Sequence, residues 1–232
     1  MVYYTGDTHG RDEKILSFIQ RFELNTDDTI VILGDAGFNY YGNDRGDKRV
    51  KRRLNDAGVK IFCIHGNHER RPETLDYYKE SHWHGGAVYI EEAFPNLIFA
   101  KDGELYELEG RQAVVIGGAY SVDKYYRLGR GLDWFADEQP SAEIKACVVS
   151  ALERNDWHID TVLSHTCPAK YIPAEAFLPG IDQDKVDRGT EDWLDEIEDR
   201  LIYRDWLCGH WHIDKRIDRV HFFMEGFEAL QE

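Results

Sequence analysis

The stretch TIVILGD, from Thr29 to Asp35, decides the fold that the rest of the sequence supports. Its four consecutive apolar residues, bounded by polar ones, are typical of a strand that is buried on both faces. Gly34 ends this strand at a point where another part of the backbone can come close. Open α/β sheets bind their ligands in the crevice outside the carboxyl ends of the strands. The position of Asp35 at such an end therefore indicates a functional residue before any motif is considered.

The length and charge of the chain limit its partners. The 232 residues suffice for one α/β domain with a well-buried core, and we expect a single domain over residues 1–232. The 44 acidic and 28 basic residues give a formal net charge of -16, so the chain as a whole repels polyanions. Long nucleic acid is therefore disfavoured as a partner, although bound divalent cations can reverse the sign of the charge inside one cleft. The sequence does not indicate the oligomeric state.

The apolar residues and the cysteines favour a cytoplasmic location. No run of about 18 apolar residues is present, and no basic segment followed by an apolar one opens the chain, so we expect no membrane partner. The four cysteines, Cys63, Cys147, Cys167 and Cys208, form no C-x-x-C pair. We expect them to be small buried side chains in a reducing compartment.

Strands and helices alternate in the first third of the sequence. Residues 2–4 and 59–64 are strand-like runs on either side of the central strand, and apolar residues at helical spacing predict a helix over 12–22. The order strand, helix, strand predicts a βαβ unit with parallel strands. The charged segment 45–56 is expected to be a solvated helix, and residues 70–79 a short helix.

The pattern changes in the second part of the sequence. Residues 81–95 are predicted to be a loop with an edge strand, and from residue 97 short strands follow one another closely, which favours antiparallel pairing in a second or a mixed sheet. The remaining predicted elements are strands at 97–100, 104–108, 113–116, 161–163, 205–208, 220–224 and 227–230 and helices at 141–154 and 190–201.

Five of the predicted strands end in side chains that can bind a metal. A single fragment of this kind is more simply explained as a turn acid or a loop histidine, but the complete set at strand ends predicts a metal site. Oxygen and imidazole donors without thiolate suit Mn²⁺, Fe, Zn²⁺ or Ni²⁺, and a neutral Asn limits the negative charge that an approaching phosphate meets. The side chains are Asp7 and His9, Asp35, Asn67 and His68, His165, and His210 and His212.

These motifs resemble the signature of the calcineurin-like metallophosphoesterases, and the resemblance extends from Asp7 to His212. The matching segments are Gly6-Asp7-Thr8-His9, Gly34-Asp35, Gly66-Asn67-His68-Glu69, His165 and Gly209-His210-Trp211-His212. The resemblance implies a four-layer α/β/β/α sandwich of two mixed sheets flanked by helices. It also implies two divalent metal ions, for which Mn²⁺ is the first expectation. Asp7, His9, Asp35 and His212 would bind one ion, and Asp35, Asn67, His165 and His210 the other.

The resemblance further implies how the reaction proceeds. Asp35 would bridge two ions about 3.5 to 4 Å apart, and a hydroxide shared by them would attack phosphorus in line. His68 corresponds to the non-ligand histidine of the family, which stabilises the developing charge or protonates the leaving oxygen; the motif does not identify its acidic partner. The protein serine/threonine phosphatases of the superfamily carry Asp-Arg-Gly shortly after Gly-Asp. Here Asp44-Arg45-Gly46 follows at a longer gap, and we interpret it as a coincidence.

The substrate is less well defined than the metal site. Lys124, Arg127 and Arg130, with tyrosines between them, are candidates for binding the non-reacting part of a phosphorylated substrate, together with Asn67 and Tyr41. The alternative for the three cations is a solvated helix face, and for the loop 37–41 it is packing on the sandwich. We expect a small phosphodiester or nucleotide-type phosphoester. A phosphomonoesterase or protein phosphatase, and a nuclease acting on single strands or ends, remain alternatives. A non-catalytic scaffold is disfavoured because no ligand is missing.

Overall fold

The structure, a computed structural model that describes residues 1–42 and 45–230, confirms the predicted α/β fold with two mixed sheets. The first sheet has the strand order β13-β1-β2-β3-β6-β5-β4, and the second has the order β11-β12-β10-β9-β8-β7. The strands are β1 (Val2–Thr5), β2 (Thr29–Ile32), β3 (Lys60–Cys63), β4 (Tyr78–Trp83), β5 (Gly86–Glu91), β6 (Leu97–Ala100), β7 (Leu105–Leu108), β8 (Arg111–Ile116), β9 (Thr161–Ser164), β10 (Asp205–Cys208), β11 (Lys215–Ile217), β12 (Val220–Phe222) and β13 (Phe227–Glu228).

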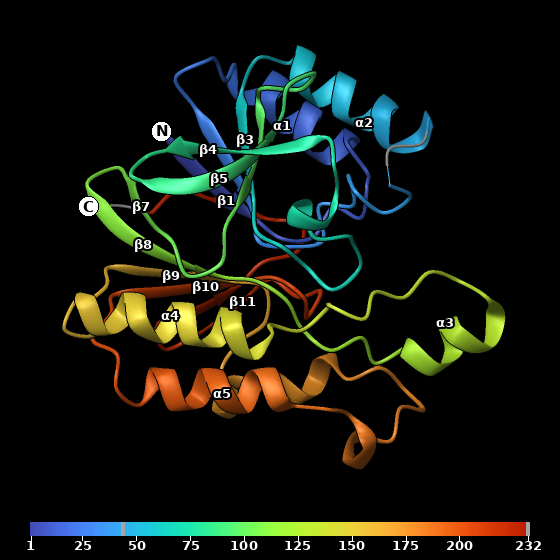
Figure 1. Cartoon of the computed structure of the whole chain (residues 1–232), viewed down its shortest axis with the longest axis vertical. Helices are drawn as coiled ribbons and strands as arrows, with labels where there is room; N and C mark the ends of the chain where they lie inside the picture. The colour runs from blue at the N-terminus through green and yellow to red at the C-terminus, as the bar shows by residue number, and fades with distance from the viewer. Residues whose placement is uncertain (43–44, 231–232) are drawn as a thin grey trace.

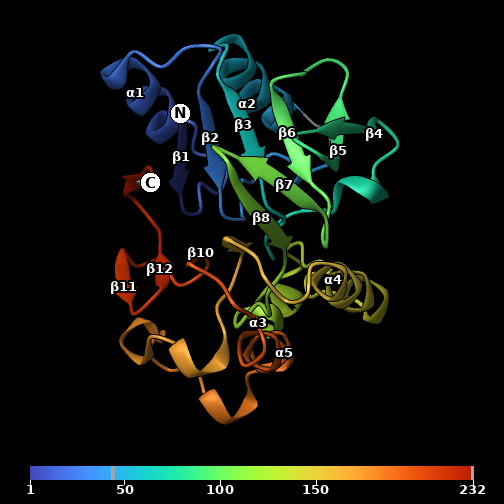
Figure 2. The same cartoon turned by 90° about the vertical axis from the view of Figure 1, so that its left-hand side faces the viewer.

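Helices cover the outer face of each sheet, which completes the four layers (Figures 1 and 2). The helices α1 (Glu13–Phe22) and α2 (Arg45–Asp56) lie on the first sheet, and α4 (Ala142–Arg154) and α5 (Gly189–Glu198) lie on the second. The short helix α3 (Lys124–Arg130) stands apart from both sheets. No helix in the described part of the chain is long and apolar enough to cross a membrane.

The alternation of side chains along the strands explains why the central stretch is apolar throughout. Val31 and Leu33 join the core between the two sheets, whereas Ile30 and Ile32 join the core between the first sheet and its helices. All four side chains are fully buried. Successive residues of a strand point to opposite faces, so a strand covered on both sides needs apolar residues at every position.

Parallel pairing brings the carboxyl ends of the key strands to common edges. In the first sheet β1, β2 and β3 are parallel neighbours, and in the second sheet β9 and β10 are parallel neighbours. The loop after each of these five strands carries the side chains that the sequence analysis assigned to the metal site. Asp44 lies outside the described residues.

The predicted helix over residues 70–79 is wrong. Pro72 opens only a 3₁₀ turn (Pro72–Thr74), after which Leu75 is extended with φ -116° and ψ 117°. The chain then enters β4, whose tyrosine and tryptophan favour a strand, and β4 pairs antiparallel with β5. The segment 81–95 is therefore a hairpin arm rather than mainly a loop, although β4 is the edge strand that the sequence predicts.

Three smaller predictions also need correction. The charged strand β11 was not predicted, because three residues with two cations carry no strand pattern. Cys147 is exposed on α4, whereas the other three cysteines are buried as expected. The helix α2 is solvated on one face only, because Val50, Lys51 and Leu54 are buried.

Lys51 makes a buried ion pair that fixes α2 to the edge of the first sheet. Its Nζ donates to Glu91 Oε2 at 2.8 Å and lies 4.9 and 5.0 Å from the ring centroids of Tyr77 and Tyr78. Burial lowers the pKa of Lys51, and Glu91 opposes this effect. The charge is thus tolerated inside the protein because it has a carboxylate and two aromatic faces as partners.

We expect Lys51→Met to lower the free energy of unfolding by about 3 to 5 kcal/mol, since it leaves Glu91 buried without its cation. The double variant Lys51→Met, Glu91→Leu should recover most of that loss. The matched control is Lys79→Met, because Lys79 and Glu92 form an exposed pair at 3.2 Å that contributes less than about 1 kcal/mol. Urea denaturation measures the free energy of unfolding of all three variants. Equal losses of this free energy for Lys51→Met and Lys79→Met would contradict the role of Lys51 and Glu91 as a buried ion pair.

Candidate metal centre

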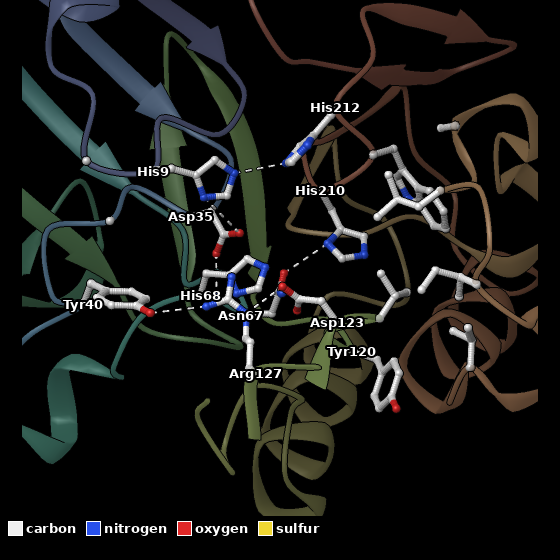
Figure 3. A pocket seen from close by; sticks show the side chains of 18 of the residues that line it. His9, Asp35, Tyr40, Asn67, His68, Tyr120, Asp123, Arg127, His210 and His212 are labelled. Carbon is white, nitrogen blue, oxygen red and sulfur yellow. Dashed lines mark hydrogen bonds and ion pairs between the residues drawn. The ribbon is translucent and has the colours of Figure 1, made fainter. Parts of the chain in front are cut away.

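The first group of predicted ligands consists of Asp7, His9 and His212. The Nε2 atom of His212 lies 3.0 Å from His9 Nε2 (Figure 3) and 3.1 Å from Asp7 Oδ2, and His9 Nε2 lies 3.7 Å from the same carboxylate oxygen. Two ligand atoms about 2.1 Å from one ion and at right angles to each other are separated by about 3 Å. The spacing of these atoms therefore fits a common cation.

The second group consists of Asn67, His165 and His210. Asn67 Oδ1 lies 2.8 Å from His165 Nε2 and 3.0 Å from His210 Nδ1. The other ring nitrogen of His165, Nδ1, lies 2.8 Å from the carbonyl oxygen of Leu33. That contact orients the imidazole so that its Nε2 faces Asn67 and the cluster.

Asp35 lies between the two groups. Its Oδ2 is 3.8 Å from His9 Nδ1 and 3.7 Å from His165 Nε2, and its Oδ1 accepts the backbone N–H of His68 at 2.8 Å. Asp7, Asp35 and His165 each offer a ligand atom within 4.8 Å of the others. The structure thus brings all seven predicted ligands together and places Asp35 within reach of both groups.

The backbone of these loops is unusual. His9, Asp35, His210 and His212 have φ values of 47°, 49°, 65° and 51°, which lie in the left-handed region. This conformation costs a residue with a side chain about 1 to 2 kcal/mol, and such residues cluster at functional sites. Four of the seven predicted ligands therefore hold a strained conformation that aims their side chains at one place.

Two glycines of the motifs permit the close approach of the ligands. A Cβ atom on Gly66 would collide with Asp35 Oδ1, and a Cβ atom on Gly34 would collide with Nδ1 of His165. Gly34 also has a φ of 95°, which only glycine adopts easily. The packing of the centre thus requires these two glycines, which precede Asp35 and Asn67.

The electrostatics of the pocket favour the metal-binding protonation state of two ligands, Asp7 and His210, whereas the hydrogen bond to Asp7 raises the pKa of His212. Burial alone would raise the pKa of Asp7, but the hydrogen bond from His212 and the charges of His165 and His9 hold that pKa well below its usual range. Burial, together with the neighbouring His165, holds the pKa of His210 well below its usual value. Asp7 is therefore a carboxylate and His210 a neutral imidazole.

His68 lines the cavity beside this cluster without joining either group. Burial lowers its pKa; the charges of Asp35 and Asp123 raise the pKa, and that of Arg127 lowers it. Arg127 is held in place, because its Nε donates to Asp123 Oδ2 at 2.7 Å and its Nη1 to the Tyr40 hydroxyl at 3.3 Å. Asp35 and Asp123 are thus the acids whose charges raise the pKa of His68, and neither is a hydrogen-bonded partner of its ring among the described residues.

A cavity of about 700 Å³ lies over the cluster. Of the predicted substrate-binding residues, Asn67, Tyr41 and Arg127 line it. Lys124 and Arg130 do not: their cations lie 4.1 Å from the Trp134 ring centroid and 5.5 Å from the Tyr126 ring centroid. The cavity therefore gives no support to Lys124 and Arg130 as substrate-binding residues.

The loop 37–41 both packs on the sandwich and lines the cavity, which are the two roles that the sequence analysis considered for it. Phe38 and Asn39 are fully buried, so the first half of the loop packs on the sandwich. Tyr40 and Tyr41 line the cavity, so the second half forms part of its wall.

The sequence analysis missed two sets of cavity residues. One set is the cations Arg11, Arg49 and Arg188, and the other is an apolar wall from the segment 172–186 together with Trp211. The only signal for the wall was a run of large apolar residues between Pro173 and Val186 that followed neither a helical nor a strand period. The wall consists of Ile172, Phe177, Leu178, Ile181, Val186 and Trp211.

Comparison with known proteins supports the assignment of the cluster. Residues 1–214 match a family model described as Calcineurin-like phosphoesterase. No curated protein matches the chain. Among solved structures, one similar chain is a protein of unknown function from Aquifex aeolicus, with 16% sequence identity, coverage of 72% of this chain and 80% of that chain, and a TM-score of 0.31.

The effect of Asp35→Asn on stability should change sign with the metal. In a chelator the variant should be at least as stable as the wild type, because it removes one of two like charges that are buried together. With Mn²⁺ the wild type should gain more stability than the variant, since a ligand at 100 times its Kd adds about 2.7 kcal/mol to the free energy of unfolding. Thermal unfolding with and without Mn²⁺ measures both effects. Equal gains for the two proteins would exclude Asp35 as a ligand.

Proposed function

The chain belongs to the calcineurin-like phosphoesterase family and is a metal-dependent hydrolase of phosphoester bonds, and we propose that it acts through two metal ions on a small phosphodiester or nucleotide-type phosphoester. One observation carries the proposal. A single buried carboxylate, Asp35, lies 3.8 Å from a ring nitrogen of one ligand group and 3.7 Å from a ring nitrogen of the other. Such a shared carboxylate is what a two-ion centre requires.

The seven donors divide into two sets that share Asp35. The donors are carboxylate, imidazole and amide groups, which favour Mn²⁺ and also suit Fe, Zn²⁺ or Ni²⁺. Ions held there would supply Lewis acidity and would activate a water molecule as the nucleophile at neutral pH. We assign Asp7, His9, Asp35 and His212 to one ion and Asp35, Asn67, His165 and His210 to the other.

Four side chains outside the ligand sets have roles in the reaction. Arg127 lines the cavity and is fixed by Asp123 and Tyr40, so its guanidinium can hold a phosphoryl oxygen in one orientation. His68, beside Asp35, can give a proton or a hydrogen bond to the leaving oxygen. Asp123 and Tyr40 keep Arg127 from folding away when no substrate is bound.

The dimensions and charge of the cavity favour a small substrate. A volume of about 700 Å³ is typical of a pocket for a small molecule. The net charge of -16 disfavours the nuclease alternative for long strands. Arg45 does not line the cavity although Gly46 does, which supports interpreting Asp44-Arg45-Gly46 as a coincidence. The four cysteines are free thiols, which supports a cytoplasmic enzyme.

Asp35→Asn should abolish turnover. With Mn²⁺ and either p-nitrophenyl phosphate or bis(p-nitrophenyl) phosphate, we expect kcat to fall at least about 100-fold, because the variant loses the charge shared by the two ions. Asp27→Asn, an exposed carboxylate on a loop, is the matched control and should keep full activity. Unchanged turnover in Asp35→Asn would rule the mechanism out.

His68→Ala should separate chemistry from metal binding. We expect kcat to fall about 100- to 10,000-fold, while elemental analysis finds the metal content of the wild type. The control is His82→Ala, since His82 is exposed on β4. A variant that retains both its metal and its kcat would refute the proton-donor role of His68.

A further inference from the structure

We propose that the non-reacting group of the substrate is an aromatic ring, which binds against the apolar wall of the cavity. The inference rests on the function proposed above and names the class of substrate for the same centre. The wall lines the same cavity as Tyr40 and Arg127. The sequence had placed the substrate-binding aromatic residues between Lys124 and Arg130 and at Tyr41 instead.

The wall begins directly beside the metal centre. Trp211 lies between the two ligand histidines of its loop, and its ring centroid is 5.2 Å from that of His210. Phe177 continues the wall, with its ring centroid 6.3 Å from that of Trp211 and the two planes inclined at 44°. A phosphorus atom held over His210 would therefore place one of its ester substituents against Trp211 and Phe177.

The wall is apolar, yet it is left open to water. Leu178 is 56% exposed, and Ile172, Phe177 and Ile181 are only partly buried. They come from a segment without long helices or strands, in which short 3₁₀ turns alternate with extended residues. Each Å² of apolar surface removed from water contributes about 25 cal/mol. A substrate group that covers the wall thus gains binding energy that an inorganic phosphate or a sugar does not.

A planar ring fits the wall better than a flexible chain. Tyr120, Phe177 and Trp211 all line the cavity, and the guanidinium of Arg188 lies 6.0 Å from the Phe177 ring centroid. Aromatic faces and a guanidinium plane are the partners on which flat π-systems stack. Gln183 and Asp187 also line this side, where they can meet polar atoms at the edge of a ring such as a nucleobase.

Binding of three phosphonates to the Mn²⁺-loaded protein tests the proposal without any turnover. Calorimetry would compare phenylphosphonate, methylphosphonate and hexylphosphonate, which share the group that binds at the centre. We expect phenylphosphonate to bind at least about 10-fold more tightly than methylphosphonate, since stacking and burial each contribute on the order of 1 kcal/mol. Hexylphosphonate should lie between the two.

Variants of the wall locate the effect. Phe177→Ala and Leu178→Ala should reduce the phenyl-to-methyl affinity ratio at least about threefold, and leave methylphosphonate binding unchanged. The matched control is Leu132→Ala, since Leu132 is 47% exposed and lies outside the cavity lining. Leu178 is so exposed that its variant should fold even if Phe177→Ala does not, and melting temperatures check this.

The outcomes separate this inference from the proposed function. Three results would each overturn the proposal of an aromatic substrate group. They are equal affinities for phenylphosphonate and methylphosphonate, tighter binding of hexylphosphonate than of phenylphosphonate, and a phenyl-to-methyl affinity ratio that both wall variants leave unchanged. The proposed function would be unaffected by these results, because hydrolysis of aryl phosphoesters tests it separately. Conversely, a ratio that depends on the wall, in a protein that hydrolyses no phosphoester, would overturn the proposed function and support the binding site.

Discussion

The repulsion between two buried carboxylates is the constraint on which the structure depends. Asp7 and Asp35 are 2% and 1% exposed, and each offers an oxygen to the same small space. Like charges so placed are unfavourable unless cations or donors offset them. The surrounding imidazoles supply part of that compensation. Two backbone N–H groups also contribute: that of His68 donates to Asp35 Oδ1, and that of His210 donates to Asp7 Oδ1 at 3.0 Å. Bound cations supply the rest.

The two-sheet architecture delivers the groups that this centre needs. β1 and β2 are parallel neighbours, so the loops after them carry Asp7 and Asp35 to the same edge. The second sheet contributes His165 and His210 from β9 and β10, which are also parallel neighbours. The apolar core between the sheets holds the two edges in register. The metal centre therefore spans both sheets, and the rigidity of that core determines how precisely its ligands meet.

The sequence predicted what depends on local pattern and missed what depends on packing. Buried strands produce apolar runs, and ligands at their ends follow from topology, so Thr29–Ile32 and Asp35 could be placed without a structure. The segment 172–186 could not, because a wall residue in an irregular loop has no period. Lys124 and Arg130 had the right chemistry for a phosphate, but α3 turns them towards Trp134 and Tyr126. The predicted helix over residues 70–79 is limited to one 3₁₀ turn, because Leu75 is extended and the chain enters β4.

The central claim is that one carboxylate joins two metal ions, and electron paramagnetic resonance of the Mn²⁺-loaded protein tests it most directly. Ions that share Asp35 about 3.5 to 4 Å apart should be exchange-coupled. The account predicts a coupled multiline spectrum that grows as two equivalents of Mn²⁺ are added. A six-line spectrum of isolated Mn²⁺ that saturates at one equivalent would contradict it.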